Sequence, residues 1–185
     1  MRTPNVTDTE LAARATAGDD GAFGELVDRH GPAVRRAARV ILGNEHDADD
    51  AAQDGFLAAW RAIGRYDRTR PFRPWLMRIV INAARDARRR GTVRRTEQLS
   101  PTAAAAGGGP DQHTDRALLR EKLAAAMAAL PERQRLAVLM FDAEGYPHAE
   151  IAATLGVPEG TVRSDVFHAR RALRASLGPL LEEMR

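Results

Sequence analysis

Apolar residues recur with the period of an α-helix in almost every patterned segment of this 185-residue chain. Phe23, Leu26 and Val27, for example, follow the spacing i, i+3, i+4, which places their side chains on one face of a helix. No segment of useful length shows the apolar–polar alternation of a half-buried strand,. The sequence therefore predicts an all-α fold.

Local signals predict where the helices of the first half begin and end. Thr7 and Glu10 have the spacing of a capping box, which predicts a helix from there to about residue 17,. Asp20 is expected to cap a second helix, and Pro32 to begin a third, because proline is tolerated in a first helical turn. The other expected features are a helix end near Gly43, an acidic helix at 47–63, a loop at 64–74 and a basic helix at 75–90.

Composition changes sharply at residues 96–112, which read TEQLSPTAAAAGGGPDQ. Small residues, prolines and a glycine triplet bury too little surface to offset the entropy of ordering. We expect a flexible linker at 96–113 between two small helical domains, at 8–95 and 114–177.

The first of these domains changes electrical sign along its length. Residues 40–60 contain five acidic residues and no Lys or Arg, whereas residues 61–95 contain twelve Arg and two acidic residues. Arg matches phosphate in charge and geometry, and aromatic rings stack on bases. The reversal indicates two partners for one domain, the second of them a nucleic acid.

The acidic helix has two distinct faces. Its predicted core stripe consists of Ala52, Phe56, Ala59, Trp60 and Ile63. Asp50, Gln53, Asp54 and Leu57 follow the spacing i, i+3, i+4, i+7 on another face,. That face is either simply solvated or, because an exposed leucine lies beside acids, a docking surface for a basic protein. No His accompanies the carboxylates, so a metal or catalytic site is not expected there.

The basic helix also has two faces. Its predicted buried stripe is Leu76, Ile79, Val80, Ala83 and Ala87. Another face carries Trp75, Arg78, Asn82, Arg85 and Arg89, and the loop before it carries Tyr66, Arg68, Arg70, Phe72 and Arg73. Arginine binds phosphate or base edges, asparagine hydrogen-bonds bases and aromatic rings stack on unpaired bases. The alternative is that Phe72 and Trp75 only close the core while the arginines are solvated.

The C-terminal half contains the pattern of a helix-turn-helix at about residues 147–174. A short helix from Pro147 to Leu155 is expected to stop at Gly156, and a second helix to start at Pro158,. The apolar residues of the first helix are expected to face those of the second: Ile151, Ala152 and Leu155 against Val162, Val166, Ala169 and Leu173. Its outward residues are Glu159, Thr161, Arg163, Ser164, Phe167, Arg170 and Arg171. We assign Thr161, Arg163, Ser164 and Phe167 to base edges and the later arginines mainly to phosphates. A plain αα-hairpin without a DNA role is the alternative.

Several classes of function are not expected. The chain has no Cys, which excludes a disulfide framework and a thiolate nucleophile. The histidines lack a metal-binding spacing, so no metal and no cofactor are expected. No run approaches the length needed to cross a bilayer, and the N-terminus lacks a secretory pattern,. We expect a cytoplasmic protein without membrane insertion.

Together the two halves resemble bacterial RNA polymerase sigma factors of the extracytoplasmic-function (ECF) type. The resemblance is carried by DADDAAQDGFLAAWRAIGRYD, RPFRPWLMRIVINAARDARRR, LPERQRLAVLMF and the helix-turn-helix. It implies a sigma-two helical bundle, a linker and a sigma-four domain with a helix-turn-helix. It also implies a non-enzymatic factor that binds core RNA polymerase, directs it to promoters with −35 and −10 elements and assists promoter opening.

The resemblance implies roles for the residues singled out above. Asp50, Gln53, Asp54 and Leu57 match the surface that docks on the clamp of the largest polymerase subunit. The loop at 66–73 and the face of the basic helix match the −10 element site, and residues 161–171 match the −35 recognition helix. The polymerase flap region, promoter DNA and an anti-sigma factor are the other implied partners.

Asp165 and His168 depart from the family pattern, which favours basic residues at these positions. Asp165 is expected either to accept a hydrogen bond from a cytosine amino group or to turn away from DNA. A free-standing helix-turn-helix regulator with an N-terminal regulatory domain is the competing function, although it would not need the charge reversal at 45–95. A helical enzyme is a third alternative, for which no catalytic constellation is present.

Overall fold

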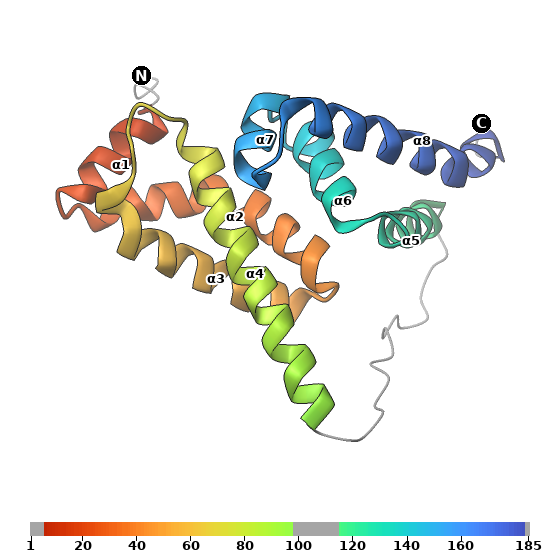
Figure 1. Ribbon diagram of the computed structural model, residues 1–185, viewed down its shortest axis with the longest axis horizontal. Coiled ribbons are helices and arrows are strands. Elements are labelled where there is room, and N and C mark those ends of the chain that lie inside the picture. The colour runs from red at the N-terminus through yellow and green to blue at the C-terminus, as the bar shows by residue number, and fades with distance from the viewer. Residues whose placement is uncertain (1–5, 98–114, 184–185) are drawn as a thin grey trace.

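The computed structural model describes residues 6–97 and 115–183, in which every regular element is a helix (Figure 1). The N-terminal part comprises α1 (Asp8–Thr16), α2 (Asp20–Leu42), α3 (Glu45–Ala62), a 3₁₀ turn (Ile63–Arg65) and α4 (Phe72–Glu97). The C-terminal part comprises α5 (Asp115–Ala128), α6 (Glu132–Val138), a π-helical segment (Leu139–Ala143), α7 (His148–Leu155) and α8 (Glu159–Glu183). The predicted all-α class is confirmed, whereas most of the predicted linker lies outside the described residues.

The helix starts of the N-terminal part follow the sequence signals closely. Thr7 and Glu10 form the predicted capping box, in which Thr7 Oγ1 accepts from the Glu10 N–H at 3.2 Å,. The cap of α2 is Asp19 rather than Asp20, and its carboxylate accepts from the Ala22 N–H at 3.0 Å. The C-cap Gly43 has φ 81°, a left-handed conformation that suits glycine,.

The prediction that Pro32 begins a separate helix is wrong. Pro32 lies inside α2, which continues without a break from Asp20 to Leu42. Proline removes one helical hydrogen bond, but the buried stripe of α2 runs through it, from Phe23 and Leu26 to Val34 and Ile41. Burial of that stripe against α3 and α4 keeps the helix intact.

Helices α3 and α4 pack unusually close together because the contact is made of small residues. Ala48, Ala51, Ala52, Gly55 and Ala59 are buried on α3. A Cβ atom added at Gly55 would lie 2.8 Å from Val80 Cγ2 and 3.1 Å from Val80 Cα, so only glycine fits here without movement.

The start of α4 differs from the prediction. The helix begins at Phe72 rather than Trp75, so Phe72, Arg73 and Pro74 form its first turn instead of the end of a loop. Proline needs no N–H partner in a first turn. The buried residues of α4 also lie on two sides, because Met77, Ile81 and Ala84 are as buried as Leu76 and Val80.

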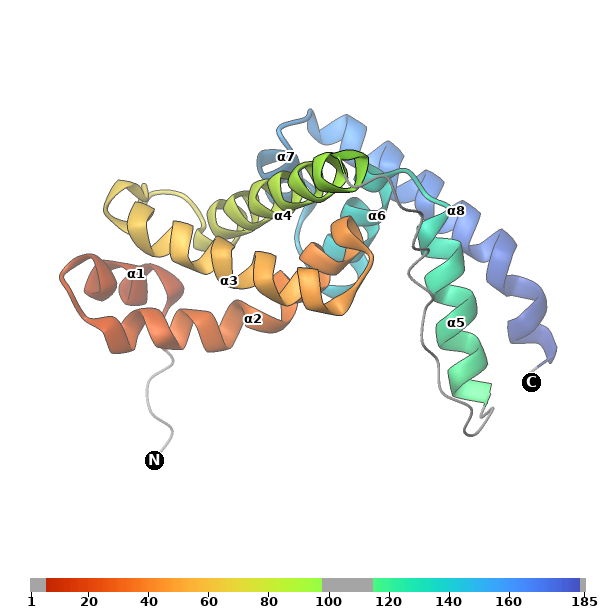
Figure 2. The same ribbon diagram turned by 90° about the horizontal axis from the view of Figure 1, so that it is seen from below.

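The second buried side of α4 contacts the C-terminal part. One cluster of buried apolar side chains combines Ile41, Met77 and Ile81 of the N-terminal part with Leu136, Met140, Tyr146, Ile151, Val162 and Val166 of the C-terminal part. Helix α7 lies against α4 (Figure 1), and α5 and the end of α8 extend away from the bundle (Figure 2). The sequence predicted two tethered domains but gave no sign of this shared core.

Candidate nucleic-acid and protein interfaces

The acidic face of α3 is exposed as the sequence predicted. Asp50, Gln53 and Asp54 all face solvent, and Leu57 is 47% exposed. A groove of about 470 Å³ runs beside this face, and Phe56, Leu57 and Trp60 line it. Carboxylates next to an open apolar groove can bind a protein helix that presents both basic and apolar side chains.

The aromatic residues of the preceding loop are not displayed for stacking. Tyr66 and Phe72 are buried in the core of the N-terminal part, and their rings meet edge to face at a centroid separation of 5.4 Å. The expectation that both rings are presented to bases is therefore corrected: they close the core. Tyr66 also fixes the loop, because its hydroxyl donates to the Arg70 carbonyl at 2.5 Å.

The arginines of the same loop are displayed. Arg68 and Arg70 are exposed, and the turn that carries them is held by Asp67, which accepts from the Thr69 N–H at 3.0 Å. A hydrogen bond from the Thr69 hydroxyl, together with this one from the Thr69 N–H, lowers the pKa of Asp67, so the turn is held by a charged carboxylate at neutral pH.

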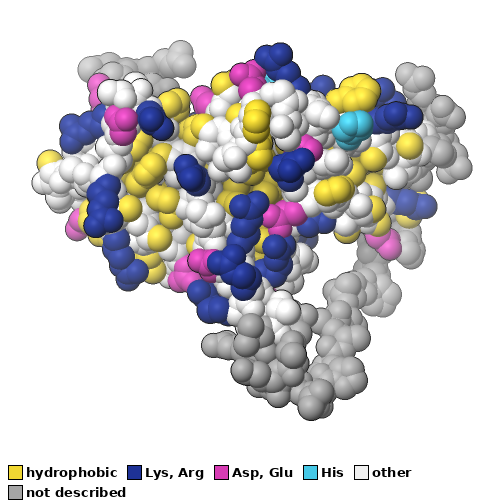
Figure 3. Space-filling model, in the orientation of Figure 1, with side chains coloured by type: hydrophobic (Ala, Val, Ile, Leu, Met, Phe, Trp, Pro, Cys, Tyr) yellow, Lys and Arg dark blue, Asp and Glu magenta, His cyan; other side chains and the backbone are white. Residues whose placement is uncertain are grey.

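The predicted basic face of α4 is only partly open. Arg78 and Asn82 are exposed, and Trp75 is half-buried against Tyr66 and Phe72. Arg85 is half-buried because its Nε donates to Glu132 of α6 at 2.9 Å, and Arg89 pairs with Asp86. Figure 3 shows Lys and Arg side chains gathered over the middle of α4. The sequence placed these residues correctly on one side of the helix but could not show the partner of Arg85.

The helix-turn-helix forms between α7 and α8. Gly156 ends α7 with φ 69°, and the Val162 N–H of α8 donates to the Pro158 carbonyl. Ile151 packs on Val162 and Val166 as predicted. Ala169 and Leu173 were also predicted to face α7, but they pack instead on Leu130 and Met127, because α5 and α6 cover that stretch of α8.

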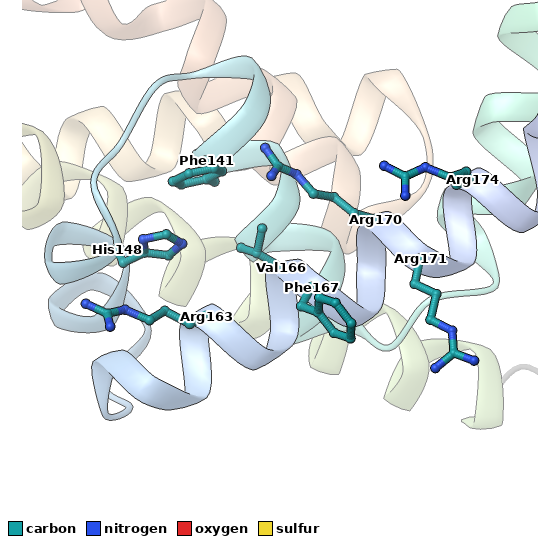
Figure 4. Close-up of a pocket in the computed structure, with 8 residues that line it drawn as sticks. All are labelled: Phe141, His148, Arg163, Val166, Phe167, Arg170, Arg171 and Arg174. Atoms are coloured by element: carbon teal, nitrogen blue, oxygen red, sulfur yellow. The ribbon is translucent and has the colours of Figure 1, made fainter.

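The predicted recognition face lies on the outer side of α8 (Figure 4). Arg163, Ser164, Phe167, Arg170 and Arg171 are exposed, whereas Glu159 and Thr161 are half-buried. Phe167 is 62% exposed, so most of its ring is free to contact a partner outside the protein. Arg163 pairs with Glu159 at 2.6 Å, so Glu159 positions this arginine on the recognition face.

Asp165 turns away from the recognition face. Its side chain is buried, and both carboxylate oxygens accept from the Arg133 guanidinium of α6, at 2.5 and 3.2 Å. The same hydrogen bond raises the pKa of Arg133. Of the two orientations expected from the sequence, the structure adopts the one that keeps the carboxylate away from DNA.

Two aromatic residues beside α8 were missed. The rings of Phe141 and His148 stack at a centroid separation of 4.3 Å, and together with α8 they line a groove of about 570 Å³ (Figure 4). Arg170 reaches into it, paired with Asp142 at 2.9 Å and 4.9 Å above the Phe141 ring. The π-helical segment places Phe141 and Asp142 beside this groove. No signal in the sequence predicted that the helix would widen from α to π geometry here.

Residues 6–97 and 115–183 contain neither a metal site nor a membrane-spanning helix. Within these ranges no group of His, Asp and Glu side chains is arranged to hold a metal ion. No helix in the described parts has the length and hydrophobicity to cross a membrane.

Comparison with known proteins identifies the family. Sigma-70 region 2 matches residues 26–94, and Sigma-70 region 4 matches residues 120–173. The chain is 38% identical to RNA polymerase sigma factor NccH of Alcaligenes xylosoxydans xylosoxydans, over 96% of this chain and 97% of NccH. It is 39% identical to ECF RNA polymerase sigma factor SigM of Mycobacterium tuberculosis, over 94% of this chain and 86% of SigM. The chain belongs to the ECF group of RNA polymerase sigma factors.

Solved structures agree with this assignment. The structure of CnrH in complex with the cytosolic domain of CnrY superposes with a TM-score of 0.71 at 34% identity, over 93% of this chain and 97% of CnrH. The sigma factor RpoE from Bartonella quintana shares the fold, with the same TM-score at 24% identity.

As a sigma factor, this protein binds core RNA polymerase and promoter DNA and gives the polymerase its promoter specificity without being an enzyme. The free-standing regulator and the helical enzyme considered from the sequence are thereby excluded. The region 2 match includes both α3 and most of α4, and the region 4 match includes the helix-turn-helix.

Proposed function

We propose that this sigma factor uses three separate surfaces during initiation. The clamp face consists of Asp50, Gln53, Asp54 and Leu57. The −10 face consists of Arg68, Arg70, Arg73, Trp75, Arg78, Asn82, Arg85 and Arg89. The −35 face consists of Thr161, Arg163, Ser164, Phe167, Arg170 and Arg171. One observation carries the proposal. On α3, acidic residues are exposed beside Leu57, and on the adjacent α4, Arg78 and Asn82 are exposed.

The clamp face fits the clamp of the largest polymerase subunit. Its carboxylates attract basic side chains from a distance, and Leu57 with the groove beside it supplies apolar area for a stable complex,. These carboxylates do not suit a DNA-binding surface, because they repel phosphate. The clamp face is therefore the protein-binding side of the N-terminal part.

The −10 face fits single-stranded DNA. Arg68 and Arg70 extend from a turn that Tyr66 and Asp67 hold in place. The two arginines are therefore preorganised for binding DNA. Arg78 contacts phosphate and Asn82 a base edge, while the exposed side of Trp75 offers a surface for stacking. Tyr66 and Phe72 shape the site from behind instead of contacting bases.

The −35 face fits the major groove of duplex DNA. The N-terminal turns of α8 carry Thr161, Arg163 and Ser164, which is where a recognition helix meets base edges. Phe167 offers apolar contact to a thymine methyl group, and Arg171 contacts phosphate. Arg170 reaches phosphate only when it leaves Asp142.

Further partners and the location follow from the same proposal. We place this sigma factor in the cytoplasm, where core polymerase works, and expect its C-terminal part to contact the polymerase flap region. CnrH has been solved in complex with the cytosolic domain of CnrY, and we extend that kind of control to this chain as an anti-sigma factor that covers its docking surfaces. The proposed boundaries are 8–95 for the sigma-two domain and 114–177 for the sigma-four domain, with 96–113 between them.

Charge reversal on α3 tests the clamp face. The double variant Asp50→Lys, Asp54→Lys should bind core polymerase at least about tenfold more weakly, because like charges then face each other. The matched control is Asp28→Lys, which reverses an exposed carboxylate on α2 outside the clamp face. Titration of labelled core polymerase measures both, and equal affinity of the double variant and wild type would refute the assignment.

A further inference from the structure

One arginine of the proposed −35 face is paired with a carboxylate from outside α8. The Arg170 guanidinium donates to both carboxylate oxygens of Asp142, from Nε at 2.9 Å and also from Nη2. By contrast, Arg171, the next residue along α8, is exposed and has no ion pair among the described residues. Two neighbouring cations of the same face therefore differ in how freely they can reach DNA.

The carboxylate comes from the π-helical segment at Leu139–Ala143. Met140 of that segment is fully buried, and its carbonyl accepts from the Tyr146 N–H at 2.9 Å. A single widened turn of this kind is frequent at functional sites. Here the anchored turn leaves Asp142 exposed at its surface, within hydrogen-bonding distance of α8.

An aromatic ring holds Arg170 on the same side of α8. Its guanidinium carbon lies 4.9 Å from the centre of the Phe141 ring, which stacks in turn on His148. Figure 4 shows the Arg170 side chain pointing toward Phe141, whereas the Arg171 side chain points away from it. A bidentate ion pair and a cation–π contact thus act together to keep Arg170 in the groove.

Pairing with Asp142 removes Arg170 from the sequence-independent attraction to DNA. That attraction comes from cations that neutralise phosphates and release counterions, and a guanidinium already neutralised by a carboxylate adds no net charge. Arg170 must leave Asp142 before the same N–H groups can bind a phosphate, and the freed carboxylate then faces DNA unpaired. Proteins gain specificity from such unfavourable contacts with wrong ligands as well as from favourable contacts with the right one.

We infer that Asp142 is a positioning residue that sets the selectivity of the −35 face, by withholding Arg170 from any duplex that the base contacts of α8 do not already hold. The inference rests on the proposed −35 face. It goes further because it assigns selectivity to an acidic residue outside the recognition helix, which lowers the affinity for wrong sequences.

Competition binding on the holoenzyme tests this inference. Core polymerase with the full-length chain is bound to a promoter fragment found by run-off transcription, and to the same fragment with its −35 element scrambled. Asp142→Asn keeps the shape of the side chain and removes its charge. Glu121→Gln is the matched control, because it removes one exposed negative charge on α5, outside the groove.

Asp142→Asn should bind the scrambled fragment about three- to tenfold more tightly than wild type, with a log–log salt slope steeper by about one. Its affinity for the promoter fragment should rise by a smaller factor, so selectivity falls. Glu121→Gln should match wild type on both fragments. In an Arg170→Ala background the gain from Asp142→Asn should fall below about twofold, because Asp142 acts through this arginine.

A gain that persists without Arg170 would show that the carboxylate only repels DNA, and would overturn the inference. Unchanged selectivity in Asp142→Asn would also overturn it, and so would weaker binding to both fragments, the result expected of a carboxylate that orients Arg170 toward DNA. Arg163→Ala tests the −35 face independently of Asp142. If Arg163→Ala leaves −35 selectivity unchanged, the face itself fails; if it relaxes selectivity while Asp142→Asn does not, only this inference fails.

Discussion

Asp165 lies within a helix that is proposed to contact DNA phosphates, yet its carboxylate should reduce DNA affinity little. It is buried and points to Arg133 of α6 rather than outward. A carboxylate at this position therefore supports the packing of α8 on α6. His168, the other departure from the family pattern, is exposed beside Phe167 with the two rings 5.5 Å apart.

Removing the Asp165 carboxylate should therefore affect stability rather than recognition. Asp165→Ala should lower the free energy of unfolding by about 1–2 kcal/mol, since Arg133 loses a charged hydrogen-bond partner but is exposed enough to be rehydrated,. Urea unfolding measures this effect. Ser164→Ala is the control and should leave stability nearly unchanged. A change of −35 base preference in Asp165→Ala, at unchanged stability, would contradict the assignment.

The start of α1 carries a pH-dependent contact. Asp8 Oδ2 lies 2.8 Å from His30 Nε2. The hydrogen bond from His30 lowers the pKa of Asp8, and burial opposes that effect only in part. Because this pKa is lower in the folded than in the unfolded protein, the contact stabilises the protein above about pH 4 and is lost as the pH falls further.

We expect Asp8→Asn to lower the free energy of unfolding by about 0.5–1 kcal/mol at pH 7. The expected effect is small because a partly exposed ion pair contributes little to stability. The difference from wild type should shrink toward zero below pH 4. Asp20→Asn is the matched control, since Asp20 likewise begins a helix but is exposed with no ion pair among the described contacts. Thermal melts across pH 3–7 measure both, and a pH-independent difference would contradict the role of the Asp8 charge.

At the scale of elements, local signals predicted helix ends better than helix continuity. The capping box at Thr7 and the left-handed glycines 43 and 156 each act through their own backbone neighbours, so sequence alone could locate them. Pro32 misled the prediction because its local cost is outweighed by burial of a stripe that spans the whole of α2. The π-helical segment likewise depends on packing rather than on local preference.

Two helical glycines, one at the crossing of α3 and α4 and one on α2, should have opposite effects when each is replaced by alanine. Gly55→Ala should lower the free energy of unfolding by about 1–3 kcal/mol, because its Cβ would overlap Val80,. Gly24→Ala on the open side of α2, where nothing lies within 4 Å, should raise it by up to about 1 kcal/mol through helix propensity. Chemical denaturation measures both variants. Stabilisation by Gly55→Ala would show that the helices do not approach this closely.

At the scale of the whole molecule, the sequence predicted the composition of the parts but not their association. The sequence could predict that Asp50 and Leu57 share one helix face, and that Arg78 and Asn82 share another, because helical spacing determines which side chains lie together. Met77, Ile81 and Ala84 were missed because their partners lie more than 50 residues further along the chain, in α6 and α7. The sequence assigned Tyr66 to DNA and left open whether Phe72 binds DNA or closes the core, because aromatic residues in a loop look alike in either role.

One small protein can bind polymerase and DNA together because its proposed binding faces lie on different helices. The proposed clamp face and −10 face belong to adjacent helices of one bundle, and the proposed −35 face belongs to α8 of the C-terminal part. Acidic and basic residues are thus kept on successive helices.

Run-off transcription with core polymerase on a library of genomic fragments tests the central claim most directly. Wild-type protein should direct transcripts from a limited set of start sites, and the Asp50→Lys, Asp54→Lys variant should direct none. Arg163→Ala should lose about 1–3 kcal/mol of discrimination at one base of the −35 element and so relax that position in the selected promoters. Tight duplex binding by the chain alone, with no start-site-specific transcript in the presence of core polymerase, would contradict the account.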